Sequence, residues 1–271
     1  MTQIPAVPSH DQDADAQATP PVESVDRALR ILLELASAGP KGVALAELAA
    51  ATGLNKASVH RSLAALKHRA FATQDPITGR YLLGGAAAQL GVSFYGSDNL
   101  EGLLHGALME LSARVGELVH LGVLDGTHVV YLDKVEPERS VRVFSSVGAR
   151  VPAVRTAMGR AMLSSMGLER ASLAAFIGEG AHPDQAWADH VWSELQGAPG
   201  RGYAREVEEN EKGITCVALP ISRGARVVGA VSVTVPAARM TAKRMAEIAA
   251  EIHAALGRAL PEGMSAGWPR R

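Results

Sequence analysis

The chain has 271 residues, a formal net charge of −1 and 47% hydrophobic residues. This length predicts one large domain or two medium ones, with enough apolar side chains for buried cores. Cys216 is the sole cysteine, so no disulfide can form within the chain, and no apolar run approaches the ~20 residues that a membrane helix needs. The first residues also lack a cationic start followed by an apolar core, which argues against a secretory signal. We therefore expect a cytoplasmic protein with no membrane partner.

The charges are unevenly distributed along the chain. Residues 1–23 contain four acidic residues and no Lys or Arg, whereas residues 24–83 contain eight Lys or Arg and four acidic residues. A basic segment joined to a nearly neutral remainder is typical of a nucleic-acid-binding module attached to another domain. Residues 1–21 are rich in Ala, Pro, Asp and Gln and lack periodicity, which predicts a disordered tail.

The first helix is expected from Ser24, as its capping residue, to about Ala36, where Gly39-Pro40 ends it. The next segment, Leu45 to Lys67, is predicted to form two short helices joined by one tight turn. Gly53 ends the first of them and Asn55 caps the next, as in a helix-turn-helix. An ordinary helical hairpin with a solvated polar face is the alternative at this point.

A β-hairpin is predicted directly after these helices. Two short strands, 70–73 and 80–83, flank the turn residues Asp75, Pro76 and Gly79. Helix-turn-helix followed by hairpin on a basic segment favours a winged helix-turn-helix DNA-binding domain over residues 22–84. Arg61 is the best candidate to read a base, since arginine pairs with guanine, and Lys56 and Ser58 lie near a helix N-terminus that attracts phosphate. The full set of DNA-binding candidates is Lys56, Ser58, His60, Arg61, Lys67, Arg80 and Arg27.

The remainder of the chain alternates strands and helices. Residues 85–98 predict a linker helix, and residues 99–262 predict a second domain of α+β class. Asp125-Gly126 lies between two β-rich runs and predicts a hairpin, and residues 140–145 alternate as a strand does. Residues 197–202 are expected to form a loop, and residues 263–271 a flexible tail.

No group of residues supplies enzymatic chemistry. The serines lie outside any nucleophile elbow, and the glycines form no phosphate-binding loop. His120, His128 and Cys216 match no established zinc spacing. We predict no catalytic residues, no metal site and no cofactor. Two alternatives remain open: a metal-dependent or metabolic enzyme or sensor with an accessory winged helix, and a ligand-free architectural DNA binder.

Several stretches, taken together, resemble the IclR family of transcription regulators. They are SVDRALRILLEL (24–35), LAELAAATGLNKASVHRSLAAL (45–66), GRYLLG (79–84), VGARVPAVRTAMGRAML (147–163), GYAREVEENEKGITCVALPI (202–221) and VVGAVSVTVPAAR (227–239). The resemblance implies an N-terminal winged helix-turn-helix and a C-terminal GAF-like effector-binding domain. It also implies a homodimer or homotetramer on a double-stranded DNA operator.

The resemblance further implies where a small-molecule effector binds. Carried over residue by residue, the site comprises Thr156, Ala157, Met158, Gly159, Glu206 and Cys216. Two positions depart from the family pattern: Val154-Arg155 stands where a histidine is frequent, and Arg160 stands where lysine is frequent. The expected function is a ligand-responsive DNA-binding transcription regulator, a repressor by family habit, whose effector is a small organic acid or aromatic metabolite.

Overall fold

A computed structural model of the chain describes residues 20–95, 99–137, 145–177 and 185–268. The chain divides into two compact units, Met1–Ser97 and Asp98–Arg271, and each is described by itself. Most of the predicted N-terminal tail and nearly all of the predicted strand at 140–145 lie outside the described residues. Among the described residues, no helix is long and apolar enough to cross a membrane.

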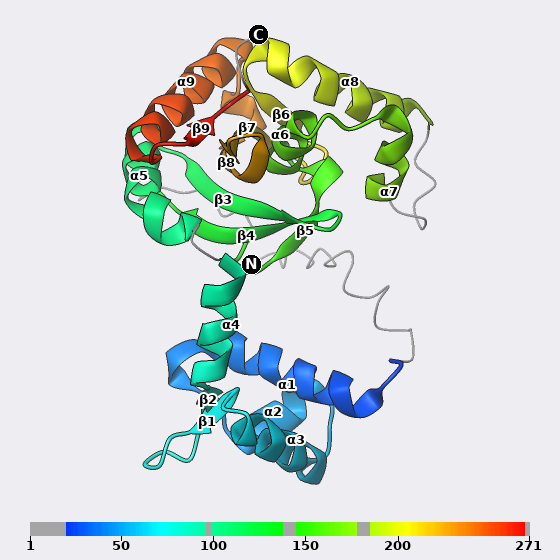
Figure 1. The fold of residues 1–271 in the computed structure, drawn as a ribbon, viewed down its shortest axis with the longest axis vertical. Helices are drawn as coiled ribbons and strands as arrows, with labels where there is room; N and C mark the ends of the chain where they lie inside the picture. The colour runs from blue at the N-terminus through cyan, green and yellow to red at the C-terminus, as the bar shows by residue number, and fades with distance from the viewer. Residues whose placement is uncertain (1–19, 96–98, 138–144, 178–184, 269–271) are drawn as a thin grey trace, which may run out of the picture. The chain divides into compact units, whose positions relative to one another are not determined.

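The first unit is a three-helix core with a small hairpin and one following helix (Figure 1). Its elements are α1 (Glu23–Ala38), the 3-10 turn η2 (Gly39–Lys41), α2 (Leu45–Thr52), α3 (Lys56–His68), β1 (Ala72–Gln74), β2 (Tyr81–Leu83) and α4 (Gly85–Tyr95). Fully buried Ile31, Leu35, Leu48, Val59 and Leu63 join the three helices. This is the predicted winged helix-turn-helix.

The start of α1 differs from the prediction. The helix begins at Glu23, and Val22 rather than Ser24 holds the capping position, without a side-chain hydrogen bond. The acidic side chains of Glu23 and Asp26 lie in the first turn, where negative charge is favourable beside the helix N-terminus. The first turn therefore does not need a capping hydroxyl.

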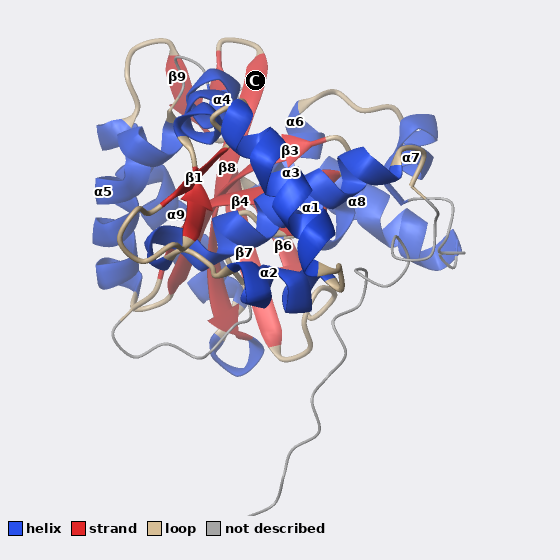
Figure 2. Cartoon of the chain, turned by 90° about the horizontal axis from the view of Figure 1, so that it is seen from below, coloured by secondary structure: helices blue, strands red, loops and turns tan. Residues whose placement is uncertain are grey.

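The second unit is a single antiparallel sheet with helices on both faces. Its elements are α5 (Leu100–Val115), β3 (Leu118–Asp125), β4 (His128–Val135), β5 (Arg150–Pro152), η3 (Ala153–Arg155), α6 (Ala157–Ser165), η4 (Arg170–Ser172), α7 (Leu173–Ile177), α8 (Gln185–Arg201), β6 (Ala204–Val207), β7 (Ile214–Arg223), β8 (Arg226–Pro236), η5 (Ala237–Arg239), α9 (Ala242–Ala259) and β9 (Met264–Ala266). The strands lie in the order β5-β4-β3-β8-β7-β6, and β9 also pairs with β7. Figure 2 shows these strands between α5 and α9 on one side and α6, α7 and α8 on the other.

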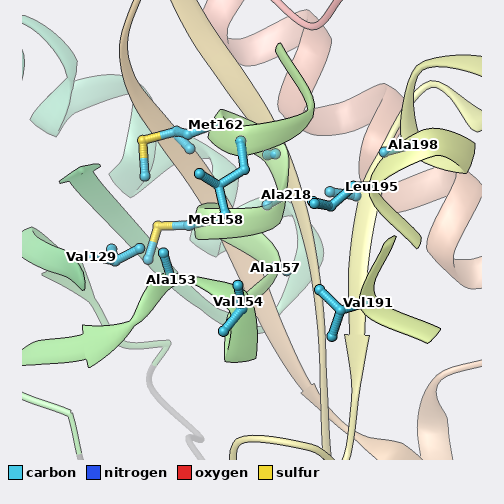
Figure 3. Close-up of a cluster of buried hydrophobic side chains, with 14 of the residues drawn as sticks. Val129, Ala153, Val154, Ala157, Met158, Met162, Val191, Leu195, Ala198 and Ala218 are labelled. Carbon is cyan, nitrogen blue, oxygen red and sulfur yellow. The ribbon is translucent and has the colours of Figure 1, made fainter. Parts of the chain in front are cut away.

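Helix α6 lies in the centre of the second unit. Every residue from Ala157 to Leu163 is buried, as expected for a helix enclosed by protein on all sides. Met158 and Met162 extend toward the sheet, and Leu195 and Ala198 of α8 lie on the other side of α6 (Figure 3). The sheet, α6 and α8 thus share one hydrophobic core.

Two predictions for the second unit are wrong. Residues 264–266 form β9 rather than a flexible tail, because β7 extends past the end of β6 and its free edge pairs with them. Gly267 continues this contact by donating a hydrogen bond to the Pro220 carbonyl at 2.8 Å. Residues 197–201 continue α8 instead of forming a loop, since burial of Ala198 against the core outweighs the weak helix propensity of glycine and proline.

Candidate DNA-binding surface and ligand site

Helix α3 is set in place by the residues on either side of the turn before it. Gly53 adopts the left-handed conformation, with φ of 67°, which lets α2 end sharply. The Asn55 side chain accepts a hydrogen bond from the Ser58 amide at 2.8 Å and caps α3. Val59 and Leu63 face the core. The opposite face of α3 therefore faces outward, and it carries Lys56, His60 and Arg61.

Two of the predicted DNA-binding residues contact one another. Ser58 is buried, and its hydroxyl accepts a hydrogen bond from Arg61 Nη2 at 3.2 Å. The structure thus places Ser58 beneath the outward face, where it orients the Arg61 guanidinium rather than presenting its own hydroxyl.

Three other predicted cations have partners within the first unit. Lys67 donates a hydrogen bond to Gln74 of the hairpin at 3.0 Å. Arg80 donates to the Lys41 and Gly42 carbonyls and forms an ion pair with Glu47 at 2.7 Å. Arg27 pairs with Glu23 at 2.8 Å. By contrast, the side chains of Lys56 and His60 are exposed and form no hydrogen bond or ion pair within the described residues.

The predicted ligand site begins at the first turn of α6. Thr156 caps the helix: its hydroxyl accepts a hydrogen bond from the Gly159 amide at 3.0 Å. Gly159 approaches η3 so closely that a Cβ atom there would lie 2.1 Å from the Ala153 carbonyl oxygen. With Ala157 and Met158, these residues form a buried wall beside the sheet.

Glu206 and Cys216 lie on the sheet beside this wall. Glu206 is paired with Cys216 across β6 and β7, and Cys216 with Thr234 across β7 and β8. Residues directly opposite in antiparallel strands point to the same face, so the three side chains form a row. The structure thus brings all six predicted residues to the side of the sheet covered by α6.

A chain of polar contacts continues this row across the sheet. Cys216 Sγ lies 3.3 Å from Thr234 Oγ1, which lies 3.4 Å from His120 Nδ1. His120 Nε2 lies 2.8 Å from Ser145 Oγ, and its ring stacks on Tyr131 with centroids 4.8 Å apart. The sequence suggested His120 only as a metal ligand. Its contacts with Thr234 and Tyr131 depend on strand register, and Ser145 reaches it from a segment outside the strands.

Burial controls the ionisation of these groups. It lowers the pKa of His120 to about 4, with a further contribution from the Lys134 charge, so the imidazole is neutral at pH 7. Burial raises the pKa of Glu206, although its carboxylate accepts hydrogen bonds from the Glu209 and Asn210 amides. Burial, reinforced by the Glu206 carboxylate, also raises the pKa of the Cys216 thiol, which disfavours a nucleophilic thiolate.

Arg160 fixes the segment that follows β6. Its guanidinium is buried, donates to the Val154 carbonyl at 2.8 Å and forms an ion pair with Glu209. Because Glu206 accepts the Glu209 amide, Arg160 connects α6 to the turn that holds the Glu206 carboxylate. Arg155, by contrast, lies over the Trp187 ring at 5.5 Å. Within the described ranges, no three His, Cys, Asp or Glu side chains are close enough to hold a metal ion.

Comparison with known proteins decides the family. The IclR helix-turn-helix domain matches residues 24–76, and the bacterial transcriptional regulator IclR C-terminal domain matches residues 95–259. The chain belongs to the IclR family. It is therefore a ligand-responsive, DNA-binding transcription regulator and not an enzyme, and its α+β fold combines a winged helix-turn-helix with a GAF-like effector-binding domain.

Curated relatives of the IclR family match along nearly their whole length. The HTH-type transcriptional regulator XynR of Escherichia coli is 32% identical over 89% of this chain and 98% of its own length. The transcriptional repressor IclR of E. coli is 30% identical over 88% of this chain and 89% of its own.

Solved structures share the fold. The Thermotoga maritima IclR crystal structure has a TM-score of 0.65 and 26% identity, covering 87% of this chain and 96% of its own. An IclR homolog from Microbacterium hydrocarbonoxydans, complexed with 4-hydroxybenzoate, has a TM-score of 0.66 at 19% identity over 87% of this chain and 100% of its own.

Proposed function

We propose that this IclR-family chain is a cytoplasmic repressor. Residues 22–84 bind the operator, residues 85–98 link the two domains, and residues 99–262 bind the effector. The effector is a small organic acid or aromatic metabolite that binds beside the first turn of α6. The effector binds one arrangement of the oligomer more tightly than another. This difference shifts the oligomer between the two arrangements and so changes its affinity for the operator.

The observation that carries the effector assignment is the row of buried and half-buried polar side chains on the sheet face that α6 covers. His120, Thr234, Cys216 and Glu206 provide hydrogen-bonding groups beside the apolar side chains of Ala157 and Met158. Binding sites for small molecules combine an apolar lining with a few convergent polar groups in this way. Lys134 is paired with His120 on the neighbouring strand, where its ammonium forms an ion pair with Glu136 and donates to the Ser145 carbonyl at 2.8 Å.

The relatives support the finer points of this proposal. One E. coli relative is a repressor by name, and a protein of the same fold binds 4-hydroxybenzoate, which combines a ring with a carboxylate and a hydroxyl. Such a ligand matches the mixed character of the site. We therefore include the repressor role and this ligand class in the proposal.

An exposed apolar stripe on α1 supports a homodimer as the basic assembly, either alone or within a homotetramer. Val22, Val25, Leu29 and Leu33 follow one another at helical spacing and are all more than half exposed. The other side of α1 fills the core with Ile31 and Leu35, so this helix is apolar on two faces. A second copy of α1 would bury the stripe and would pair two recognition helices for a two-fold operator.

Replacing Arg61 tests the DNA-binding part of the proposal. The operator is first selected from random duplexes with the full-length protein. Arg61→Ala should then weaken operator binding by ~1–3 kcal/mol and relax sequence preference at one base pair, since an arginine on a recognition helix reads guanine. Fluorescence anisotropy titrations on the operator and on single-base variants measure both effects.

Arg226→Ala is the matched control, because it removes the same charge from an exposed position on β8 in the other unit. It should bind the operator as the wild-type protein does. Unchanged affinity and unchanged base preference in Arg61→Ala would show that α3 does not read bases through Arg61.

A further inference from the structure

A pocket of about 820 Å³ lies at the opposite end of α6 from the proposed effector site. Leu163 and Ser164 of α6, the end of α8 and the segment after β9 line it, and Leu219 of β7 contributes from the sheet. Thr156, Gly159, Glu206, Cys216 and the other predicted effector residues do not line it. Its volume falls within the range of ~300–1,000 Å³ that small-molecule pockets occupy.

Two tryptophan rings form fixed walls of this pocket. Trp268 donates a hydrogen bond from Nε1 to Ser164 Oγ at 3.2 Å. Trp192 lies under the Arg170 guanidinium at 5.7 Å, and Arg170 is itself held by the Ala188 carbonyl at 3.0 Å. Because other contacts hold both indoles, their flat faces are in place before any ligand binds, which lowers the entropic cost of binding.

The remaining lining residues define the chemistry of a ligand. Leu163, Leu168 and Leu195 are apolar, and the lining contains no Asp, Glu, Lys or Arg. Gln196 and His253 are its exposed polar groups, and within the described chain neither side chain forms a hydrogen bond or ion pair. A charged ligand would lose hydration here without gaining a counter-charge, whereas a neutral ligand with one hydrogen-bonding group would lose little.

We propose that this pocket is a second small-molecule site, which takes a neutral aromatic molecule of two or three rings. The rings lie between Trp192 and Trp268, and a polar substituent reaches Gln196 or His253 at the rim. The site is independent of the effector assignment above, and its test requires neither operator DNA nor the effector.

The test uses two probes that share one skeleton. N-phenyl-1-naphthylamine is neutral and fluoresces in apolar surroundings, and 8-anilinonaphthalene-1-sulfonate adds a negative charge to the same rings. The full-length protein should bind the neutral probe saturably, at one molecule per chain, with energy transfer from tryptophan. The sulfonate should bind at least tenfold more weakly.

A matched pair of substitutions locates the bound probe. Gly200 lines the pocket within α8, and a Cβ atom there meets nothing within 4 Å. Gly200→Phe should therefore fill the pocket and weaken binding of the neutral probe at least tenfold. Gly257→Phe places the same side chain at an equally open helical glycine on α9, outside the pocket, and should bind as wild type does.

A second variant keeps the test independent of how well Gly200→Phe folds. Trp268→Ala removes one wall near the chain end and should also weaken binding several-fold, with less energy transfer. Wild-type affinity in both pocket variants, equal affinity for the two probes, or binding without saturation would each overturn the proposal.

Discussion

Gly159 allows the first turn of α6 to lie directly on η3. A Cβ atom at this position would lie 2.1 Å from the Ala153 carbonyl oxygen and 2.5 Å from its carbon, both of which are backbone atoms. Gly159→Ala must therefore displace main chain in a filled core, and we expect it to lower the free energy of unfolding by about 3 kcal/mol. Urea unfolding followed by circular dichroism measures the loss.

Gly257→Ala provides the control for this substitution. Gly257 is also helical, but a Cβ atom there meets nothing within 4 Å. Alanine should raise the free energy of unfolding by about 0.5–1 kcal/mol, because glycine loses more backbone entropy in a helix. Equal effects at the two positions would contradict the close approach of α6 to η3.

His120 should make the protein sensitive to acid. Its pKa is lowered to about 4 in the folded chain, whereas an unfolded chain has the ordinary value of ~6.5. As the pH falls through this window the unfolded chain takes up the proton first, so the free energy of unfolding falls by about 3 kcal/mol. Above pH ~6.5 the imidazole is neutral in both the folded and the unfolded chain, so His120 does not change the free energy of unfolding with pH.

Comparison with His120→Gln isolates this effect from that of the carboxylates. Urea unfolding of both proteins from pH 7.5 to pH 4.5 should show a smaller loss of stability in the variant, because glutamine does not titrate. Parallel stability curves for the two proteins would mean that His120 is not buried in its neutral form.

Single residues were predictable from the sequence where local geometry alone determines them. Gly53 and Asn55 end and cap helices as their types predict, because a left-handed backbone and a capping oxygen are local requirements. The partners of Ser58 and Arg80 were not predictable. Arg80 depends on Glu47, which tertiary packing brings near. Arg61 lies one helical turn from Ser58, but the sequence does not show that Ser58 is buried and that the guanidinium turns back to its hydroxyl.

At the scale of elements, α1 exposes an apolar stripe formed by Val22, Val25, Leu29 and Leu33. Replacing Leu29 and Leu33 together by Glu should prevent the proposed pairing of two copies, because burying four carboxylates against each other is costly. Sedimentation equilibrium should then show a lower oligomeric state at the same concentration. Operator affinity should fall with it, since two linked recognition helices bind more tightly than one.

Met166→Glu is the comparison for this double variant, because Met166 is a half-exposed apolar residue outside α1. It should keep the mass and the operator affinity of wild type. An unchanged mass in the α1 double variant would exclude α1 as the dimer surface.

Elements with strong local signals were predicted correctly. The Asp125-Gly126 turn joins β3 to β4, as its sequence indicates. β9 and the last turn of α8 were missed for one shared reason. Neither has a strong intrinsic preference, and each exists because a distant element offers it a partner: the free edge of β7 for β9, and the core around α6 for α8.

At the scale of the whole molecule, the uneven charge of the sequence already separated the DNA-binding unit from the remainder. The family resemblance then placed six residues in a ligand site, and the structure gathers those six beside one sheet face. The polar contacts from Cys216 through Thr234 to His120 lay beyond sequence reasoning. Thr234 and His120 are 114 residues apart in the sequence, and only the register of the sheet brings them together.

The central claim is that one chain couples effector binding to operator binding. The direct measurement is operator affinity of the full-length protein, by fluorescence anisotropy, with and without a saturating small carboxylate identified by thermal shift. The account predicts a change of at least fivefold, within the usual range of allosteric coupling. A carboxylate that saturates the protein at one site per chain and leaves operator affinity unchanged would contradict it.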